Sequence, residues 1–277
     1  MRNLDKQRDG TPQLTGEELL QAYLKLQELN RQNIVLLASA AHELKTPLAV
    51  IKGYHDLLLT GSLGHLSEKQ KDILGESKDS CERLVRLVSM FLNYAALERG
   101  KLVLQLREND LRDCLEQMAR RLSEAFHRKG VKLETLLDPS IATFRFDYQK
   151  VQQVAENLLD NAMKHTPSGG RVTLRATPHF WERRVAKVDP TKERRRFRLP
   201  RPNSVEVRVT DSGGGIAAAH HQEIFEEFVR VDPNTCGMGL GLAIAKRFIQ
   251  AHRGKIWVES EQSIGSTFVF LLPMDQN

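Results

Sequence analysis

Four residues near position 42 have the types and spacing of a reactive centre. Glu43 follows His42 directly, and Thr46 lies one helical turn further on, so it shares a helix face with the histidine. Pro47 removes the backbone hydrogen bond to the Glu43 carbonyl and should kink the helix. An exposed imidazole whose ring proton passes to a carboxylate is a nucleophile. Taken alone, however, a surface histidine on a helix usually has no function.

A second set of polar residues lies between positions 157 and 164. Asn157 and Asn161 are one helical turn apart, and Lys164 continues the same face. Amide oxygens suit Mg²⁺, which also binds phosphates, and a lysine can neutralise phosphate charge. The set therefore predicts a magnesium and phosphate site, although a plain polar helix face is an equally good interpretation of these residues alone.

Two glycine-rich segments could approach a ligand closely. Asp211 ends a predicted strand, precedes three glycines, and can accept a hydrogen bond from an exocyclic amine. The glycines at 237, 239 and 241 lead into a helix, where backbone amides form an anion cradle for phosphates. This second segment lacks the Lys-Ser/Thr of a P-loop, and the first does not fit the dinucleotide-binding pattern.

The elements that must position these residues begin with two long helices. We expect a flexible tail over 1–16, then a helix from Glu17 to about Thr60, and a second helix capped by Ser67 and ended by Gly100. Heptad-like spacing predicts two apolar seams: Leu19, Ala22, Leu26, Leu29, Asn33, Leu36 and Ala40, and Leu74, Ser77, Cys81, Leu84, Val88, Phe91 and Ala95. Two such helices leave apolar faces uncovered, so the hairpin 17–100 should dimerise into a four-helix bundle.

After residue 100 the pattern changes to mixed strands and helices. Helices are expected over Leu111–His127, Asp147–Lys164, Gln222–Val229 and Leu242–Ala251, and strands over Lys101–Leu106, Val131–Leu137, Arg171–Ala176, Ser204–Thr210, Lys255–Glu259 and Ser266–Leu272. The whole is predicted to be α+β, with an α/β sandwich over 101–277.

Composition and charge exclude several classes. The net charge of +6 is carried entirely by nine basic and three acidic residues between Pro178 and Ser204, so the chain is a neutral body with one basic segment. The longest apolar run, 34–41, is far below the roughly 18 residues of a membrane span. Three scattered cysteines and the absence of a signal peptide favour the reducing cytoplasm.

The order of these segments resembles the sensor histidine kinases of two-component signalling. The phosphoacceptor box is AAHELKTPLAVIKGY, and the asparagine box is QQVAENLLDNAMKHTP. They are followed by the glycine box VTDSGGGI, the phenylalanine box IFEEFVR and a second glycine box, GMGLGLAIAK. The five boxes stand in the family's order and spacing, and the resemblance spans essentially all of residues 30–272.

The resemblance implies roles for individual residues. His42 would be the phosphoacceptor, Glu43 its acid/base partner, and Thr46 would position water during dephosphorylation of a response regulator. Asn157 and Asn161 would hold Mg²⁺. ATP would be bound by Asn157, Asn161, Lys164, Asp211, Gly213, Gly215, Ile216, Gly237, Gly239, Leu240, Gly241 and Leu242, with Phe225 and Phe228 anchoring a mobile lid.

The resemblance also implies the fold and the partners. It implies a homodimeric hairpin followed by a Bergerat-type ATPase sandwich related to gyrase and MutL. The phosphoryl group would pass to an aspartate on the receiver domain of a separate response regulator. Only about 30 residues precede the matching boxes, so we expect either that the signal comes from a separate sensor protein, which the sequence slightly favours, or that the chain is part of a longer one.

The basic segment departs from the family pattern, because a short turn normally joins the two strands that flank it. It is interpreted as an insertion over 178–204, either a solvated loop or an arm for an acidic partner, a membrane surface or nucleic acid.

The sequence therefore predicts an ATP-dependent protein histidine kinase. Three alternatives stay open: a pseudokinase scaffold, a net regulator phosphatase, and a gyrase-type ATPase in which Glu156 would activate water.

Overall fold

The chain forms two units, which we describe separately. The computed structural model describes residues 15–98, 102–182, 201–231 and 238–275. The first unit extends to Gly100 and the second begins at Lys101. The first is a helical hairpin and the second an α/β sandwich, so the α+β class predicted from the sequence is confirmed.

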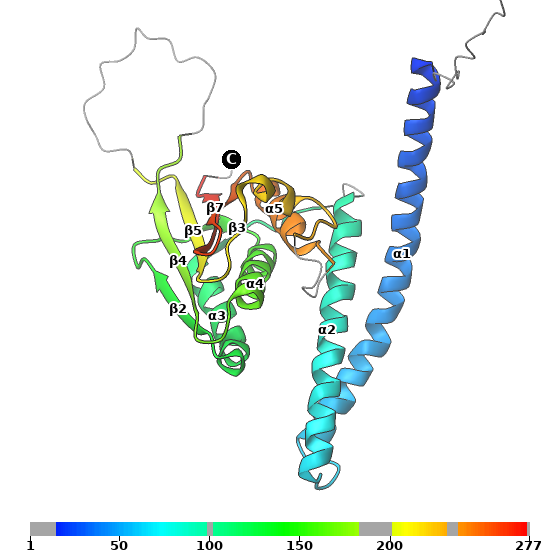
Figure 1. The fold of residues 1–277 in the computed structure, drawn as a ribbon, viewed down its shortest axis with the longest axis vertical. Helices are drawn as coiled ribbons and strands as arrows, with labels where there is room; N and C mark the ends of the chain where they lie inside the picture. Colours follow the sequence, from blue (N-terminus) through cyan, green and yellow to red (C-terminus); the bar gives the residue numbers. More distant parts are fainter. Residues whose placement is uncertain (1–14, 99–101, 183–200, 232–237, 276–277) are drawn as a thin grey trace, which may run out of the picture. The chain divides into compact units, whose positions relative to one another are not determined.

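The first unit consists of α1 (Gly16–Leu59) and α2 (Glu68–Glu98), which pack against each other. Helix α1 begins at Gly16, one residue before the expected start, because Thr15 and Glu18 form a reciprocal capping box. Ser67 and Gln70 exchange the same pair of bonds before α2. The ribbon of α1 is continuous through Pro47 and bends in its lower half (Figure 1).

The contact between the two helices follows a heptad line on α1 that differs from the predicted seam. Ile34, Ala41, Leu48 and His55 are buried at steps of seven residues, whereas Ala40 is exposed. Ala41 and Leu48 form one cluster with Cys81 and Val88 of α2. The predicted seam on α2 is buried at Cys81, Val88 and Ala95.

No described residue covers the seam in the first half of α1. Leu19 is 61% exposed and Leu26 is 66% exposed. The seam residues here are too apolar for a fully solvated helix, so the face is available to a second helix.

A polar pair interrupts the heptad line. His55 is 8% exposed, and its Nε2 lies 3.0 Å from the Ser77 hydroxyl of α2. Its Nδ1 is buried without a hydrogen-bond partner among the described residues. Polar residues at seam positions fix helix register at a cost in stability. The sequence suggested Asn33 for this task and gave no indication of His55.

The second unit contains one five-stranded sheet and a small two-stranded one. The five strands run in the order β2 (Lys132–Leu137), β4 (Arg171–His179), β5 (Ser204–Asp211), β7 (Gly265–Pro273) and β6 (Lys255–Glu261). Only β2 and β4 are parallel. β1 (Arg107–Asn109) pairs with β3 (Phe144–Phe146).

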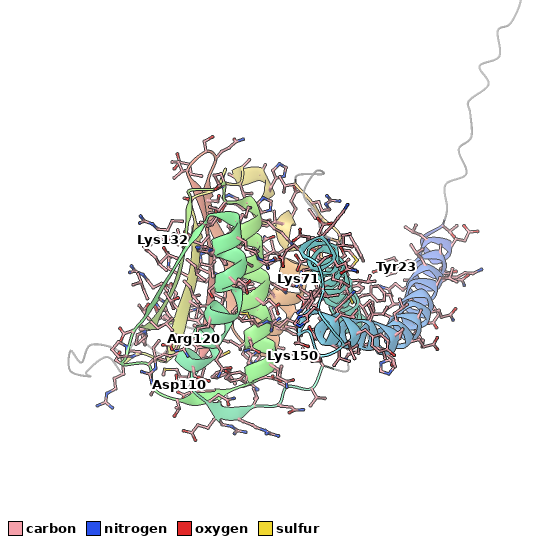
Figure 2. The ribbon with its side chains drawn as sticks, turned by 90° about the horizontal axis from the view of Figure 1, so that it is seen from below. Tyr23, Lys71, Asp110, Arg120, Lys132 and Lys150 are labelled. Carbon is pink, nitrogen blue, oxygen red and sulfur yellow. The ribbon has the colours of Figure 1, made fainter. Side chains whose placement is uncertain are left out.

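Three helices contribute to the core of this unit: α3 (Leu111–Lys129), α4 (Tyr148–His165) and α5 (Gly241–Ala251). Figure 2 labels Arg120 on α3 and Lys150 on α4, which lie side by side against the sheet. The fully buried core includes Leu115, Met118, Leu158, Leu159, Leu174, Val207, Phe248 and Phe270. Asp110 and Asp147 cap α3 and α4.

Two predicted elements differ in the structure. Residues 102–106 form no strand; the Gln105 amide donates to the Asp147 carboxylate instead of to a neighbouring strand. In place of a helix over Gln222–Val229 there are two short 3₁₀ turns, η2 (Ala218–His220) and η3 (Glu223–Phe225). Apolar spacing alone cannot distinguish a short helix from such turns.

The hairpin that carries the basic insertion is longer than expected. β4 extends three residues past Ala176, and His179 pairs with Ser204, so residues 178, 179 and 204 belong to strands and not to the insertion. Beyond this pair the Asn203 amide bonds to both the N–H and the C=O of Trp181, at 2.8 and 3.0 Å. Residues 183–200 and the predicted tail 1–14 lie outside the described residues. Among the described residues, no helix is long and apolar enough to cross a membrane.

Candidate functional site

His42 projects from α1 beside the buried heptad line. Its neighbour Ala41 is buried against α2, and His42 itself is exposed, as the spacing predicts. Glu43 and Thr46 are also exposed on the same stretch of helix. The hairpin therefore fixes the backbone at position 41 and leaves an accessible imidazole, carboxylate and hydroxyl within about one turn.

Asn157 links the two helices that border the predicted ligand site. Its side-chain amide donates to the carbonyl of Gly241, the first residue of α5, at 2.9 Å. With the amide nitrogen engaged, its oxygen is left as an acceptor. The Asn161 amide has no partner within the described part of the chain. Two amide oxygens one turn apart suit the hard-oxygen coordination of Mg²⁺.

Lys164 is on the predicted face but is engaged elsewhere. Its ammonium lies 2.6 Å from the Asp160 carboxylate, four residues earlier on α4. Both side chains are partly exposed, so the pair contributes little to stability and can open at low cost. Lys164 can reach a phosphate only after leaving Asp160.

Glu156, the candidate water-activating base of the ATPase alternative, is held by another helix. The Arg121 guanidinium of α3 lies 2.7 Å from its carboxylate. The arginine engages one carboxylate oxygen, Oε1, and would have to move away before that oxygen could accept a proton from water. This contact disfavours water activation by Glu156.

Asp211 ends β5 in a buried position, with 5% of its surface exposed. One carboxylate oxygen, Oδ1, accepts hydrogen bonds from the amides of Gly213 and Ser266, at 2.8 and 3.3 Å. Burial raises the pKa of this carboxyl, and the two amides oppose the rise. The turn thus occupies Oδ1, and Oδ2 remains as a desolvated acceptor.

The glycine turn after Asp211 lies against the end of α4. A Cβ on Gly213 would lie 2.5 Å from the carbonyl oxygen of His165, so only glycine allows this approach. The turn ends at Gly215 and Ile216, whose amide donates to the Ser260 hydroxyl at 2.8 Å. The structure therefore brings the predicted Asp211 turn next to the asparagine helix.

The second glycine segment leads into α5 as predicted. Gly239 has φ +71°, and a Cβ there would lie 2.7 Å from the carbonyl oxygen of Val229. Leu240 is buried and precedes the first helical residue, Gly241, which is followed by the half-buried Leu242. Gly237 lies outside the described residues. The N-terminus of α5, which favours anions, thus adjoins Asn157.

The two phenylalanines differ in environment. Phe225 is buried and packs edge-on against Phe268 of β7, with ring centroids 6.3 Å apart. Phe228 is 57% exposed, has φ +63°, and donates its backbone N–H to the Gly239 carbonyl. Phe225 therefore anchors the segment, and Phe228 joins it to the glycine loop through the backbone.

Sequence reasoning missed a buried histidine on the same helix. His252 at the end of α5 is wholly buried, and its Nε2 accepts the N–H of Asp147 at 3.0 Å. Burial lowers the pKa of this imidazole. Asp147 was identified only as a helix start, and no sequence signal joins two residues so far apart in the chain.

Comparison with protein families gives a match to each unit. Residues 32–100 match the His Kinase A (phospho-acceptor) domain. Residues 146–276 match the histidine kinase-, DNA gyrase B- and HSP90-like ATPase family.

Individual proteins and structures are similar over most of this chain. The circadian input-output histidine kinase CikA of Synechococcus elongatus is 31% identical over 263 residues, which are 93% of this chain and 32% of CikA. The chain thus spans about a third of the length of that relative.

Two solved structures share the fold. Full-length ShkA in complex with AMPPNP has a TM-score of 0.62 and 29% identity, covering 86% of this chain and 45% of ShkA. The histidine kinase ThkA in complex with the response regulator TrrA has a TM-score of 0.55 and 22% identity, covering 92% of this chain and 67% of that one.

Proposed function

We propose, from the fact that this chain belongs to the sensor histidine kinases, that it is an ATP-dependent kinase that phosphorylates itself on His42. The observation that carries the proposal is the exposed His42 of the hairpin in the same chain as the buried Asp211 turn and the α5 N-terminus. The first supplies a nucleophile and the second a site for a nucleotide.

The transfer needs little from the protein beyond placement and proton handling. One imidazole nitrogen of His42 attacks the γ-phosphorus of ATP, the bond to the β,γ-bridging oxygen breaks, and ADP leaves. Glu43 takes the proton from the other ring nitrogen, which keeps the phosphorylated ring neutral. The exposure of both side chains supports this assignment.

The nucleotide would be recognised by residues of the second unit. The free oxygen of Asp211 accepts the adenine amino group, and Gly213, Gly215 and Ile216 shape the base site. Gly239, Leu240, Gly241 and Leu242 would place backbone amides around the phosphates, with Lys164 adding charge once it leaves Asp160. Gly237, which lies outside the described residues, is assigned to the same phosphate site by its place in the glycine box. The lid would be anchored by Phe225 and Phe228.

Mg²⁺ fits the same site as a cofactor. Asn157 and Asn161 would hold the ion through their amide oxygens, one of which already has its nitrogen engaged by Gly241. When bound, the ion would supply positive charge that stabilises the phosphates during transfer.

Two partners follow from the proposed reaction. The exposed Leu19, Leu26 and Leu29 support a homodimer through α1. The phosphoryl acceptor would be an aspartate on a response regulator. ThkA, which shares the fold of this chain, forms a complex with the response regulator TrrA. Thr46 is exposed near His42 and would position the water that hydrolyses the aspartyl phosphate of the regulator, releasing inorganic phosphate. We place the reaction in the cytoplasm, where ATP is available.

We also propose that the basic insertion is a docking arm for an acidic partner. Both ends of the insertion are fixed, because Asn203 holds Trp181 and its own carbonyl accepts the N–H of Met274 at 2.9 Å. The arm therefore starts from a rigid base on the sheet, at the end of β5 opposite the Asp211 turn.

The proposal is tested by phosphorylation with labelled MgATP. Wild-type protein should acquire label that is stable in base and labile in acid, and His42→Gln should acquire none. His65 is an exposed histidine of the same unit, so His65→Gln is the matched control and should label normally.

Other outcomes separate the alternatives. Nucleotide binding without label in any variant would favour a scaffold or a phosphatase. ATP hydrolysis that survives His42→Gln but is lost in Glu156→Gln would favour the gyrase-type ATPase.

A further inference from the structure

The buried His252 forms a bridge between two helices. It follows α5, and its Nδ1 lies 2.7 Å from the carbonyl oxygen of Phe248, one turn earlier. Its Nε2 lies 3.0 Å from the backbone nitrogen of Asp147, which caps α4. No part of the imidazole reaches solvent, since His252 is 0% exposed.

The two backbone partners fix the protonation of the ring. An amide N–H can only donate, so Nε2 must be the acceptor, and Nδ1 carries the proton that is donated to Phe248. A doubly protonated ring would point a proton at the Asp147 amide. Of the charged groups around the ring, only the Asp147 carboxylate favours protonation, and burial opposes it more strongly.

Asp147 connects this bridge to the segment that precedes the ATPase domain. Its Oδ1 accepts the N–H of Lys150, which caps α4, at 3.1 Å. Its Oδ2 accepts the N–H of Gln105 at 2.8 Å. Gln105 lies among the residues that follow α2 in the chain, and its own side chain is exposed. The segment 102–106 is therefore bonded to the side chain of Asp147, and the backbone of Asp147 is bonded to His252.

The same two helices are joined again at the nucleotide end. Asn157, in the middle of α4, bonds to Gly241 at the start of α5, and His252, which follows α5, bonds to Asp147, which precedes α4. Two bonds that lie along the length of α5 fix how far α4 and α5 can slide against each other. That displacement would set the spacing between the asparagine oxygens and the amides of the glycine loop.

We propose that His252 is a positioning residue that couples the segment 102–106 to the nucleotide site through Asp147. The inference rests on the proposed function, because it assigns regulation to that same nucleotide site. When the segment is fastened, α4 and α5 are held in the spacing that binds nucleotide. When nucleotide binds, the fastening of the segment tightens by the same free energy, as linkage requires.

Two variants at position 252 separate coupling from helix capping. His252→Asn keeps an amide near the place of Nδ1 that can donate to Phe248, but it is too short to reach Asp147. His252→Gln places an amide oxygen near the position of Nε2 and can keep the Asp147 bond. If His252 only ends the helix, His252→Asn should behave more like wild type than His252→Gln. If His252 couples the segment to the nucleotide site, His252→Gln should behave more like wild type.

The measurement is hydrogen exchange of a peptide covering residues 101–110 in the full chain, with and without MgAMPPNP. In wild type and His252→Gln, saturating nucleotide should slow exchange of the Gln105 amide by about fivefold, a coupling of about 1 kcal/mol. In His252→Asn the slowing should vanish. Unchanged protection in His252→Asn, or none in wild type, would overturn the proposal.

Nucleotide affinity measured by calorimetry distinguishes this failure from a failure of the proposed function. If wild type binds MgAMPPNP but its Gln105 amide is unaffected, only the coupling is wrong. If wild type binds no nucleotide, the kinase assignment itself is wrong.

A reciprocal test acts on the segment. Gln105→Pro removes the amide that Asp147 accepts, and Gln105→Ala keeps it while removing the same exposed side chain. The coupling predicts nucleotide affinity about fivefold weaker in Gln105→Pro and unchanged in Gln105→Ala. Equal affinities in the two variants would contradict it.

Discussion

At the scale of single residues, the carboxylate of Asp211 lowers the stability of the folded protein at neutral pH while it is available to bind a ligand. Its carboxylate is buried, and the turn amides satisfy only Oδ1. Because burial raises its pKa, the native state holds this proton more tightly than the unfolded chain does. The resulting stability is present below the ordinary aspartate pKa and is lost as pH rises through the folded value. At neutral pH the ionised group destabilises the protein until a ligand donor reaches it.

Asp211→Asn is therefore expected to separate stability from function. The asparagine oxygen can keep both turn amides, and the buried charge disappears. The variant should be more stable than wild type at neutral pH, with an advantage that shrinks on acidification toward pH 4. Its nucleotide affinity should fall roughly 10- to 100-fold, the value of a charge-assisted hydrogen bond. Urea unfolding at several pH values and calorimetry with MgAMPPNP measure the two effects.

A control defines what would contradict this prediction. Asp138 is a partly exposed acid on the same unit whose pKa is lowered, mainly by its bond from the Ser140 hydroxyl. Asp138→Asn should leave nucleotide affinity unchanged and show no gain in stability at neutral pH. A loss of stability in Asp211→Asn at neutral pH would show that the turn needs the charge.

At the scale of elements, the heptad line of α1 combines three apolar residues with one histidine. Ala41 and Leu48 pack against α2, Ile34 is buried on the same line, and His55 occupies the next heptad position with one nitrogen unsatisfied among the described residues. An unsatisfied buried polar atom costs about 1 to 3 kcal/mol. The hairpin is therefore less stable than it would be with an apolar residue at position 55, where His55 contacts Ser77 of α2.

His55→Leu should stabilise the hairpin by about 1 kcal/mol, because an apolar side chain removes the unsatisfied nitrogen and Ser77 remains accessible to water. Both tryptophans, Trp181 and Trp257, belong to the second unit. Tryptophan fluorescence therefore reports on the second unit. The helical signal in far-ultraviolet circular dichroism reports mainly on the hairpin, because α1 and α2 have 44 and 31 residues and the helices of the second unit have 19, 18 and 11.

The expected result is a later circular dichroism transition with unchanged fluorescence. His65→Leu, in the exposed loop between the helices, is the control and should change neither signal. Destabilisation by His55→Leu would mean that the Nδ1 atom has a partner in the assembled dimer.

At the scale of the whole molecule, the net positive charge is concentrated in one insertion whose ends are clamped. Nine basic and three acidic residues lie between Pro178 and Ser204. The bonds between Asn203 and Trp181 close the β4–β5 hairpin at the point where the insertion leaves it. Changes to the arm should therefore leave the nucleotide site intact.

Replacing residues 183–200 with a short Gly-Ser linker, with the clamp retained, should leave nucleotide affinity and phosphorylation within about twofold of wild type. Binding of poly-glutamate, an acidic polypeptide probe, should fall at least tenfold and be salt-dependent in wild type. A same-length arm with glutamine at every basic position is the matched control and should behave like the linker. Loss of nucleotide binding would make the arm structural.

The nature of the partner is decided in the same assay. Tighter binding of duplex DNA, or of phosphatidylserine vesicles, than of poly-glutamate would assign the arm to that class of partner instead.

The sequence by itself determined which residues are reactive and roughly where the long elements lie. The five boxes are local strings, and His42, Asn157 and Asp211 can be found without knowing what surrounds them. Long amphipathic helices with clear caps, such as α3 and α4, are also predicted by the repeated local spacing of their apolar residues. The roles of these residues stay predictions until they are measured.

Only the tertiary structure decided the contacts that join distant residues. The bridge of His252 to Asp147, the Asn157 bond to Gly241, the Arg121 pair with Glu156 and the clamp of Trp181 by Asn203 each close a long loop of chain. Such contacts depend on how whole helices and strands pack, and a periodic pattern carries no information about its partner in space. For the same reason the sequence placed the α1 seam at Ala40, whereas packing against α2 buries Ala41.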